Sequence, residues 1–483
     1  LFFLYFIVYK KMSNSAVIHR ANENSSLYQT LKARNSKVNA FDYAVEGEVN
    51  LCEIAKSRVV INPTTTLAAG GGQTVKWELS NFGFLNELYL QTTFAEGGTN
   101  ADGSNDNFLV DHAGAWCWSR CRIVYNGQTI AEITPDFIMA SLYSRANAEE
   151  SFTLDSMLGG FAPGSAAAIG SLTGRRALAA LNNGQTLSCP LKFWFSESLG
   201  RAWDLYSLSS RAFVEVDYKA VADIQTVADT GPVNYSSSQL VAYISQMSPL
   251  GLQAYQSRNY APNSVSSQIG FTTSLFTDAI GTPIKDTATS SVGNKVKIQS
   301  ISGLVRRLFV YATTDGDRSS TSAKEYSKTI DIAQCKLLGN NQVIYDLGDC
   351  LSSADNVGQS DSSSVSQGYK TDHFVELFHN KNNNANRAIA ALGVAPATAL
   401  GGVGGGNWNP NHVKIIDFGY APNDIASADG CVSLSMISSP EIELKFAHTS
   451  SGASSVHVLA EIITLNTYNT SQNGQISFKM ITE

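Results

Sequence analysis

The fold follows from Cys121-Arg-Ile-Val-Tyr-Asn-Gly-Gln-Thr-Ile130, a stretch that occurs a second time as Cys335-Lys-Leu-Leu-Gly-Asn-Asn-Gln-Val-Ile344. The two copies share the cysteine, a basic residue after it, two aliphatic residues, an asparagine, the glutamine and the final isoleucine. In each copy an Asn-Gly or Asn-Asn pair separates two apolar runs, which predicts a β-hairpin with a tight turn.

Two more pairs of similar segments follow the same order along the chain. Residues 83–93, Gly-Phe-Leu-Asn-Glu-Leu-Tyr-Leu-Gln-Thr-Thr, resemble residues 303–313, Gly-Leu-Val-Arg-Arg-Leu-Phe-Val-Tyr-Ala-Thr. Residues 213–216 resemble residues 442–445, and the offset between the copies grows slowly along the chain. Three collinear repeats indicate two copies of one β domain, the second of which has longer loops.

Length and composition agree with two β domains. A chain of 483 residues is long for one core and sufficient for two. It has 43% hydrophobic residues, 16% charged residues and 38 glycines, a composition that suits short strands joined by many loops. The net charge of −7 argues against a surface that neutralises phosphates, so we expect no direct sequence-specific binding of nucleic acid.

The cysteines and histidines suggest no reactive site. Seven cysteines spread thinly along the chain fit reduced, buried thiols better than a disulfide framework. Cys117 and Cys121 could form half of a metal site, but no His or Cys pair nearby completes four ligands. His373 and His379 should point to opposite faces of a strand, and no His-x-Asp or His-x-Glu pair occurs. We therefore expect no catalytic residues, no cofactor and no metal, and we expect that the protein is not an enzyme.

Residues 1–46 are expected to form an N-terminal arm. Residues 1–11 are strongly apolar and precede Met12, so we expect translation to start at Met12 and the first eleven residues to lie outside the native protein. The alternative is a hydrophobic anchor, although the apolar run is short for a bilayer span. Beyond it, residues 13–46 are polar with mixed charges, and a short helix is expected over 26–34.

The first β domain is expected over residues 47–222. Alternating patterns predict strands at 59–62, 74–79, 85–93, 121–125, 129–133, 186–195 and 211–221. Thr134-Pro-Asp-Phe137 predicts a helix start, with threonine as the N-cap, proline in the first helical position and aspartate in the first turn. Apolar residues of this helix should pack it on the sheet, whereas the Gly-, Ala- and Ser-rich residues 159–184 are expected to be a long loop.

A polar segment with a Gly-Pro turn suggests a linker over residues 223–247, whose last part would be a strand or strap leading into the second domain. The second β domain is expected over residues 248–483. Its predicted strands are 267–273, 295–301, 304–313, 329–338, 342–347, 412–420, 432–436, 441–448 and 455–466. Between residues 350 and 411 lies a long loop rich in Ser, Asp, Asn, Gly and Ala, of a size that is usually functional or exposed.

A local motif resembles a known family. Pro190-Leu-Lys-Phe-Trp-Phe195 is followed by Gly200-Arg-Ala-Trp-Asp-Leu205 and then by the alternating run Arg211-Ala-Phe-Val-Glu-Val-Asp217. This order resembles the end of the first jelly roll in the double jelly-roll major capsid proteins of nucleocytoplasmic large DNA viruses, virophages and polinton-like viruses. The family usually continues with a Pro-Leu-Ile-Ala-Leu-like run, whereas Leu205-Tyr-Ser-Leu-Ser209 is more polar, which indicates a divergent member.

The resemblance implies an all-β fold of two tandem eight-stranded antiparallel jelly rolls with short helices and long loops. It implies a non-enzymatic major capsid protein that assembles as a trimeric, pseudo-hexagonal capsomer and tiles an icosahedral virion shell. The implied partners are two further copies of the chain, neighbouring capsomers and minor or penton capsid proteins, with an internal membrane also conceivable. Assembly would take place inside the host cell, with the 350–411 loops outside and the arm inside the shell.

Two alternatives remain open from the residues alone. A tandem jelly-roll carbohydrate-binding protein or adhesin would predict a signal peptide, disulfides or calcium-binding Asp clusters. A two-domain cupin-like enzyme would need a metal triad. Bound metal would discriminate among the three, since the capsid hypothesis predicts no stoichiometric metal.

Overall fold

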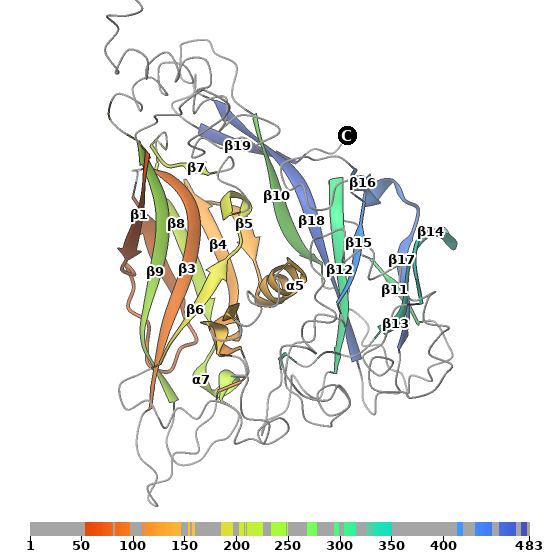
Figure 1. The fold of residues 1–483 in the computed structure, drawn as a ribbon, viewed down its shortest axis with the longest axis horizontal. Coiled ribbons are helices and arrows are strands. Elements are labelled where there is room, and N and C mark those ends of the chain that lie inside the picture. The colour runs from red at the N-terminus through yellow and green to blue at the C-terminus, as the bar shows by residue number, and fades with distance from the viewer. Residues whose placement is uncertain are drawn as a thin grey trace, which may run out of the picture.

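The chain is a pair of β-sandwiches placed side by side (Figure 1). The computed structural model describes residues 54–80, 83–96, 109–110, 112–145, 153–154, 157–159, 185–196, 202–206, 208, 210–225, 233–247, 249, 268–277, 294–298, 304–314, 326–327, 329, 332–349, 413–418, 430–446, 454–469 and 475–480. The expected arm over 1–46 and the expected loop over 350–411 lie outside these residues, as do His373 and His379.

The first sandwich is built from two antiparallel sheets that are named here by their central strands. The β9 sheet has the order β1-β9-β3-β6, and the short β7 pairs with one end of β3; the β8 sheet has the order β2-β8-β4-β5. The strands are β1 Ile54–Ile61, β2 Thr74–Leu79, β3 Phe84–Glu96, β4 Trp118–Tyr125, β5 Gln128–Ile133, β6 Gln185–Leu191, β7 Trp203–Asp204, β8 Ala212–Tyr218 and β9 Val233–Met247.

The second sandwich repeats this arrangement. The β18 sheet has the order β10-β18-β12-β15, with the short β16 on one end of β12 and β19 on the far end of β18; the β17 sheet has the order β11-β17-β13-β14. The strands are β10 Gln268–Thr277, β11 Asn294–Lys297, β12 Leu304–Thr314, β13 Ile332–Gly339, β14 Gln342–Asp349, β15 Lys414–Asp417, β16 Val432–Ser433, β17 Pro440–Phe446, β18 Ser454–Asn469 and β19 Gln475–Met480.

Both sandwiches are jelly rolls. When the two-residue strands and the additional β19 are set aside, the first and last strands of each domain, β1 with β9 and β10 with β18, lie side by side, and the strand orders of the two domains coincide. The three repeated segments predicted from the sequence lie in equivalent strands of the two domains. The hairpin β4–β5 corresponds to β13–β14, β3 corresponds to β12, and β8 corresponds to β17. Even the irregularities match, because β3 has a register shift between Leu85 and Glu87 and β12 has one between Val305 and Arg307. The predicted pair of eight-stranded jelly rolls is confirmed.

The turns that define the repeat use left-handed backbone. Asn126 and Gly127 have φ of 49° and 76°, and Asn340 and Asn341 have φ of 50° and 62°. Asparagine and glycine are the residues that adopt this conformation most readily, and two such residues in succession make the tight turn that matches the twist of a hairpin. The two predicted hairpins are thereby confirmed.

Helices are short and lie at the strand connections. α4 spans Ala113–Trp116, α5 spans Pro135–Arg145, α7 spans Val221–Ile224, and single 3-10 turns occur at η3 Trp194–Ser196 and η7 Leu434–Met436. The predicted start of α5 is confirmed, since the Thr134 hydroxyl accepts a hydrogen bond from the Phe137 amide at 3.4 Å. Among the described residues, no helix is long and apolar enough to cross a membrane.

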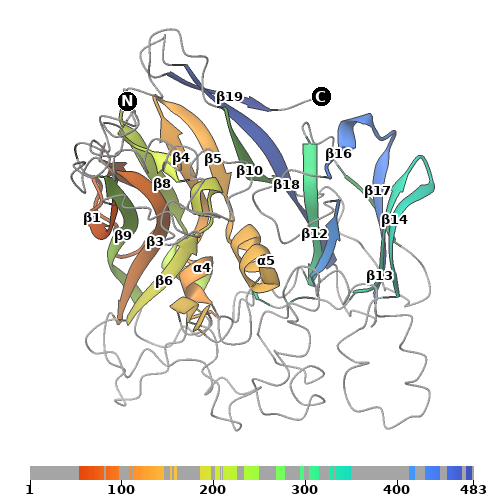
Figure 2. The same ribbon diagram turned by 45° about the horizontal axis from the view of Figure 1, so that its top comes forward.

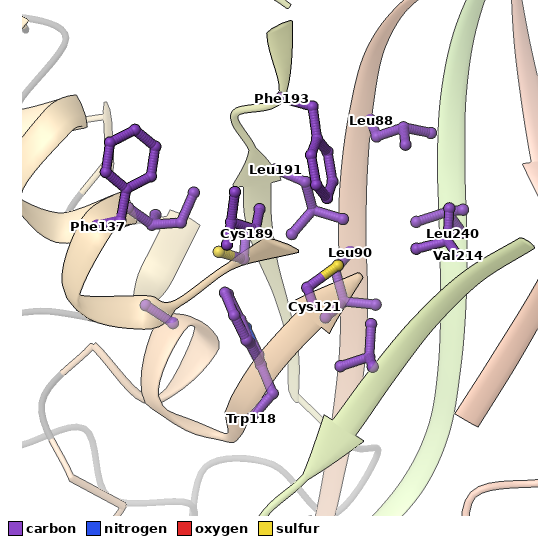
Figure 3. Close-up of a cluster of buried hydrophobic side chains, with 14 of the residues drawn as sticks. Leu88, Leu90, Trp118, Cys121, Phe137, Cys189, Leu191, Phe193, Val214 and Leu240 are labelled. Atoms are coloured by element: carbon purple, nitrogen blue, oxygen red, sulfur yellow. The ribbon is translucent and has the colours of Figure 1, made fainter. Parts of the chain in front are cut away.

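The core of the first jelly roll is dense and aromatic (Figure 3). Leu88 and Leu90 of β3 point between the sheets toward Val214 of β8, and the described tryptophans 77, 116, 118, 194 and 203 are buried. Full burial of one aliphatic or aromatic side chain contributes about 1.5 to 3 kcal/mol, so these layers hold each sandwich together. A second apolar cluster fills the interior of the second jelly roll.

Several predicted strand limits are wrong, and the strand predicted over 432–436 ends at Ser433, where the η7 turn follows. Residues 233–247, predicted as part of a linker, form β9, which pairs with β1 and with β3 and is therefore a central strand of the first jelly roll. The first jelly roll thus extends beyond 222, whereas β10 to β19 do fall within the predicted 248–483. The strand predicted over 186–195 ends at Leu191, because the aromatic residues after it turn inward as η3, where Trp194 meets Trp203 at 5.4 Å between ring centroids.

Candidate functional site

The residues weighed from the sequence as metal ligands can be placed in the structure. No group of three or more His, Cys, Asp or Glu side chains in the described part of the chain is placed to hold a metal ion. Cys117 and Cys121, weighed above as half of a metal site, are buried free thiols, as is Cys189. Burial raises the pKa of Cys117 to about 12 and also raises the pKa of Cys121 and of Cys189, so all three are protonated at neutral pH. A protonated thiol is a poor nucleophile and a poor metal ligand.

The most elaborate set of contacts is instead the junction between the two jelly rolls. Helix α5 lies between them, next to the β18 sheet (Figures 1 and 2). Phe137 of α5 meets Phe309 of β12 edge to face, with ring centroids 6.3 Å apart. The Tyr311 hydroxyl of β12 donates a hydrogen bond to the Asp136 carboxylate in the first turn of α5. Phe309 and Tyr311 are completely buried and belong to the apolar cluster of the first jelly roll.

A second part of the junction is made by residues 326 and 327, which precede β13 and dock on the first jelly roll. The Tyr326 ring stacks on Trp116 with centroids 5.5 Å apart, and the Lys219 ammonium lies 4.1 Å from the centre of the Tyr326 ring. Trp116 donates its indole N–H to the Ser327 hydroxyl at 2.9 Å, and His112 Nδ1 lies 3.0 Å from the same oxygen. Such aromatic stacking with a nearby cation and satisfied hydrogen bonds fixes the position of the segment.

A buried ion pair lies on the same face of the β18 sheet. The Arg307 Nε donates to the Asp417 carboxylate at 2.7 Å, and both side chains are almost wholly removed from solvent. Glu461 of β18 lies opposite Arg307 in the strand register, so three charged residues form a row across the sheet. Breaking a buried pair is costly because the remaining charge has lost its partner, so this row makes the face sensitive to single changes.

His457 completes this face. Its ring stacks on Tyr311 with centroids 4.8 Å apart and planes 11° apart, and its Nε2 lies 2.9 Å from the Thr313 hydroxyl. The outer face of the β18 sheet is therefore covered by the first jelly roll and carries specific polar contacts.

The equivalent face of the first jelly roll is not covered in the same way. In the repeat, Glu87, Tyr89 and Gln91 of β3 correspond to Arg307, Phe309 and Tyr311 of β12. From Asn86 to Ala95 the residues of β3 alternate between buried and half-exposed, whereas residues 305–313 of β12 are buried on both faces. On this half-exposed face Tyr89 meets Tyr243 at 5.7 Å between ring centroids, and the Lys56 ammonium lies 4.6 Å from the centre of the Tyr243 ring.

The sequence did not point to the junction residues, although one signal could have found them. β3 reads as an alternating strand, but its counterpart Leu304-Val-Arg-Arg-Leu-Phe-Val-Tyr-Ala-Thr313 does not. Loss of alternation in one of two repeated strands indicates burial on both faces, which here results from contact with the other domain.

Comparisons with known proteins agree with the topology. No family model matches the sequence, and no curated protein matches it. The crystal structure of PBCV-1 VP54, fitted into a reconstruction of the virophage Sputnik, matches with a TM-score of 0.58 at 10% identity, over 91% of this chain and 98% of that one. A quasi-atomic model of the PBCV-1 virus capsid matches with a TM-score of 0.59 at 11% identity, over 91% and 99%.

The Faustovirus major capsid protein matches with a TM-score of 0.51 at 10% identity, over 86% of this chain and 90% of that one. At such low identities the similarity concerns the fold. The chain has the double jelly-roll fold of these capsid proteins over nearly its whole length, so the fold predicted from residues 190–217 is confirmed.

Proposed function

We propose that this chain is a major capsid protein whose role is structural and not enzymatic. The observation that carries the proposal is the double jelly roll itself, which aligns with 98% of PBCV-1 VP54 and 90% of the Faustovirus major capsid protein. A fold alone does not fix a function, but a match that spans two tandem domains and their relative placement is far more specific than a match to one jelly roll.

The proposed assembly is a homotrimer of pseudo-hexagonal outline that tiles an icosahedral shell in the virion. Two similar but unequal jelly rolls in one chain let three chains approximate sixfold packing while each chain keeps distinct contacts. The packed junction supports this role, because a fixed relation between the two jelly rolls is needed if every trimer is to have the same outline. Neighbouring capsomers, minor or penton proteins and an internal membrane are further proposed partners.

The test is the solution mass of the full chain by light scattering after gel filtration, followed by negative-stain electron microscopy. The proposal predicts particles with the mass of three chains and a hexagonal outline. A monomer that binds an oligosaccharide would instead support the carbohydrate-binding alternative. A monomer with stoichiometric metal and a measurable turnover would contradict the structural role altogether.

A further inference from the structure

We propose that Asn126, at the tip of the β4–β5 hairpin, is a site of spontaneous covalent modification, in which its side-chain amide becomes a carboxylate, in part with an isoaspartyl linkage. The reactants are the chain itself and water, so no enzyme and no cofactor takes part. This modification does not depend on the proposed function, because it concerns the chemistry of one turn. Three features carry it: the residue that follows Asn126, the exposure of the turn, and the contrast with the equivalent hairpin β13–β14.

The reaction passes through a cyclic imide. The backbone nitrogen of Gly127 forms a bond to Cγ of Asn126 and gives its proton to solvent base, while the side-chain nitrogen leaves as ammonia. Water then adds to one of the ring carbonyls and opens the ring. Cleavage of the bond between nitrogen and Cγ gives aspartate, and cleavage of the bond to the backbone carbonyl carbon gives isoaspartate.

Gly127 removes the main obstacle to ring closure. A side chain on the residue after asparagine crowds the approach of the backbone nitrogen to Cγ, and glycine has no side chain. The surroundings do not restore the obstacle, since no other atom lies within 4 Å of the place where a Cβ of Gly127 would be. Glycine also has the widest backbone freedom, so the turn can leave its φ of 76° and reach the geometry of attack more readily than with any other residue.

The reacting groups are open to solvent. Asn126 and Gly127 are both exposed, so solvent base and water reach them. Among the described residues, no hydrogen bond holds the side-chain amide of Asn126 or the backbone N–H of Gly127. Attack by this nitrogen therefore breaks no existing hydrogen bond, whereas a backbone N–H within a sheet would first have to leave its carbonyl partner.

The second jelly roll contains a matched control. Asn340 and Asn341 take the places of Asn126 and Gly127, and they share the left-handed backbone and the exposure of the first hairpin. The first asparagine of this second turn is followed by a residue with a side chain and not by glycine. The two turns therefore agree in shape and in access to water and differ in the residue that would have to be attacked across.

Asn341 is protected in addition by its own contacts. Its side-chain oxygen accepts a hydrogen bond from Lys295 Nζ at 3.2 Å, which restrains the amide. The residue after it is Gln342, which carries a side chain and pairs with Gly339 in the ladder between β13 and β14. We therefore expect the second hairpin to stay intact while the first one is modified.

Modification would change both the charge and the shape of the turn. Either product adds a negative charge at the tip. Isoaspartate also inserts an extra carbon into the main chain, so the turn between Tyr125 and Gln128 no longer matches the twist of the two strands that it joins. Because β5 lies beside β10 of the second jelly roll, we expect faster hydrogen exchange in β5 of the modified chain.

The test follows the folded full chain during storage in mildly alkaline buffer at body temperature. Samples are digested with trypsin at mildly acidic pH, so that the digestion itself adds no conversion, and mass spectrometry measures the change from amide to carboxylate at each asparagine. A protein isoaspartate methyltransferase detects the isoaspartyl product. We expect Asn126 to convert at least about tenfold faster than Asn340 or Asn341.

Gly127→Asn is the matched variant, because it copies the turn of the second hairpin. Asparagine adopts left-handed backbone readily, so the variant should fold, which circular dichroism melting checks. We expect conversion at Asn126 to be about tenfold slower in this variant than in the wild-type chain. The wild-type chain unfolded in urea is a second control, and Asn126 should convert there as well.

Two results would overturn the proposal. If Asn126 converts in the unfolded chain but stays intact in the folded chain for as long as Asn340 and Asn341 do, the folded turn protects the site. If Asn126 converts equally fast in folded Gly127→Asn, the glycine is not the cause. Neither result bears on the capsid proposal, which the mass and outline of the assembly test separately.

Discussion

Strands β3 and β12 occupy the same place in two copies of one fold, yet their outer faces differ. The outer face of β12 is buried against helix α5 of the first jelly roll, and it carries Phe309, Tyr311 and the Arg307–Asp417 ion pair. The outer face of β3 is half-exposed, and Glu87 and Tyr89 stand at the positions of Arg307 and Phe309.

The difference shows how a duplicated domain becomes asymmetric. The inward-facing residues Leu88 and Leu90 have the apolar counterparts Leu308 and Val310, since both jelly rolls must fill an interior. The outward-facing residues have diverged, because one face meets a domain of the same chain and the other does not. The following predictions test that contrast, beginning with the largest expected effect.

The first prediction compares Phe309→Ala with Tyr89→Ala. Phe309 is fully buried between the domains, so its removal should lower the free energy of unfolding by about 4 kcal/mol. Because Tyr89 is half-exposed, Tyr89→Ala should lower the free energy of unfolding by no more than about 1 kcal/mol. Urea unfolding followed by fluorescence measures both. Equal losses would contradict the claim that only the β12 face is covered.

The second prediction concerns the buried ion pair. Arg307→Met should lower the free energy of unfolding by about 3 kcal/mol, because Asp417 would then be a buried charge without its guanidinium partner. The double variant Arg307→Met with Asp417→Leu should recover part of that loss, since the Asp417 charge is gone while Glu461 stays buried opposite position 307. Glu87→Met, the matched change on the exposed face, should be nearly neutral. No recovery in the double variant would show that the pair is not the cause.

The third prediction is for Ser327→Ala, which removes the hydroxyl that accepts the Trp116 indole N–H. The buried N–H then loses this acceptor, and the free energy of unfolding should fall by about 1 to 2 kcal/mol. The exposed Ser435→Ala is the control and should have no measurable effect. Hydrogen exchange at residues 326–327 should rise in the first variant, and unchanged exchange would contradict a docking role for this segment.

The fourth prediction is a loss of stability in alkali that arises in the core of the first jelly roll. Burial raises the folded-state pKa of Cys117 from the ordinary thiol value of 9.0 to about 12, so the stabilisation from the buried neutral thiol is complete below pH 9 and is lost as the pH rises toward 12. Cys117 alone should account for about 1 kcal/mol by pH 10. Between pH 8 and pH 10.5 the urea midpoint of unfolding should fall less steeply with pH in Cys117→Ala than in the wild-type chain. Equal slopes in the two chains would show that Cys117 does not cause the loss of stability.

The sequence predicted those parts of the fold that depend on local patterns. The hairpins, the repeat, helix α5 and most strands could be read because turn chemistry and alternation act over a few residues. The start of strand β9 was missed because it is rich in serine and resembles a linker, and the end of β9, predicted as a strand or strap leading into the second domain, belongs to the first. In the structure Ser238 is buried and its hydroxyl contacts the Tyr218 hydroxyl, so a polar residue is accommodated inside the sheet.

The junction could not be predicted from local patterns. Contacts such as Trp116 with Ser327 join residues far apart in sequence, and nothing near either residue indicates the other. Likewise the aromatic run at 193–195 favours a strand by propensity, yet Phe195 turns to stack on Trp203 at 6.1 Å between centroids. In both cases tertiary packing overrides the local preference.

The most direct test of the account is a cryo-electron microscopy structure of the assembly formed by the full chain. The account predicts three chains around one axis in a particle of pseudo-hexagonal outline, with the two jelly rolls of each chain joined through α5 and β12 as in the single chain. A particle with another number of chains, or a chain that stays monomeric, would contradict it.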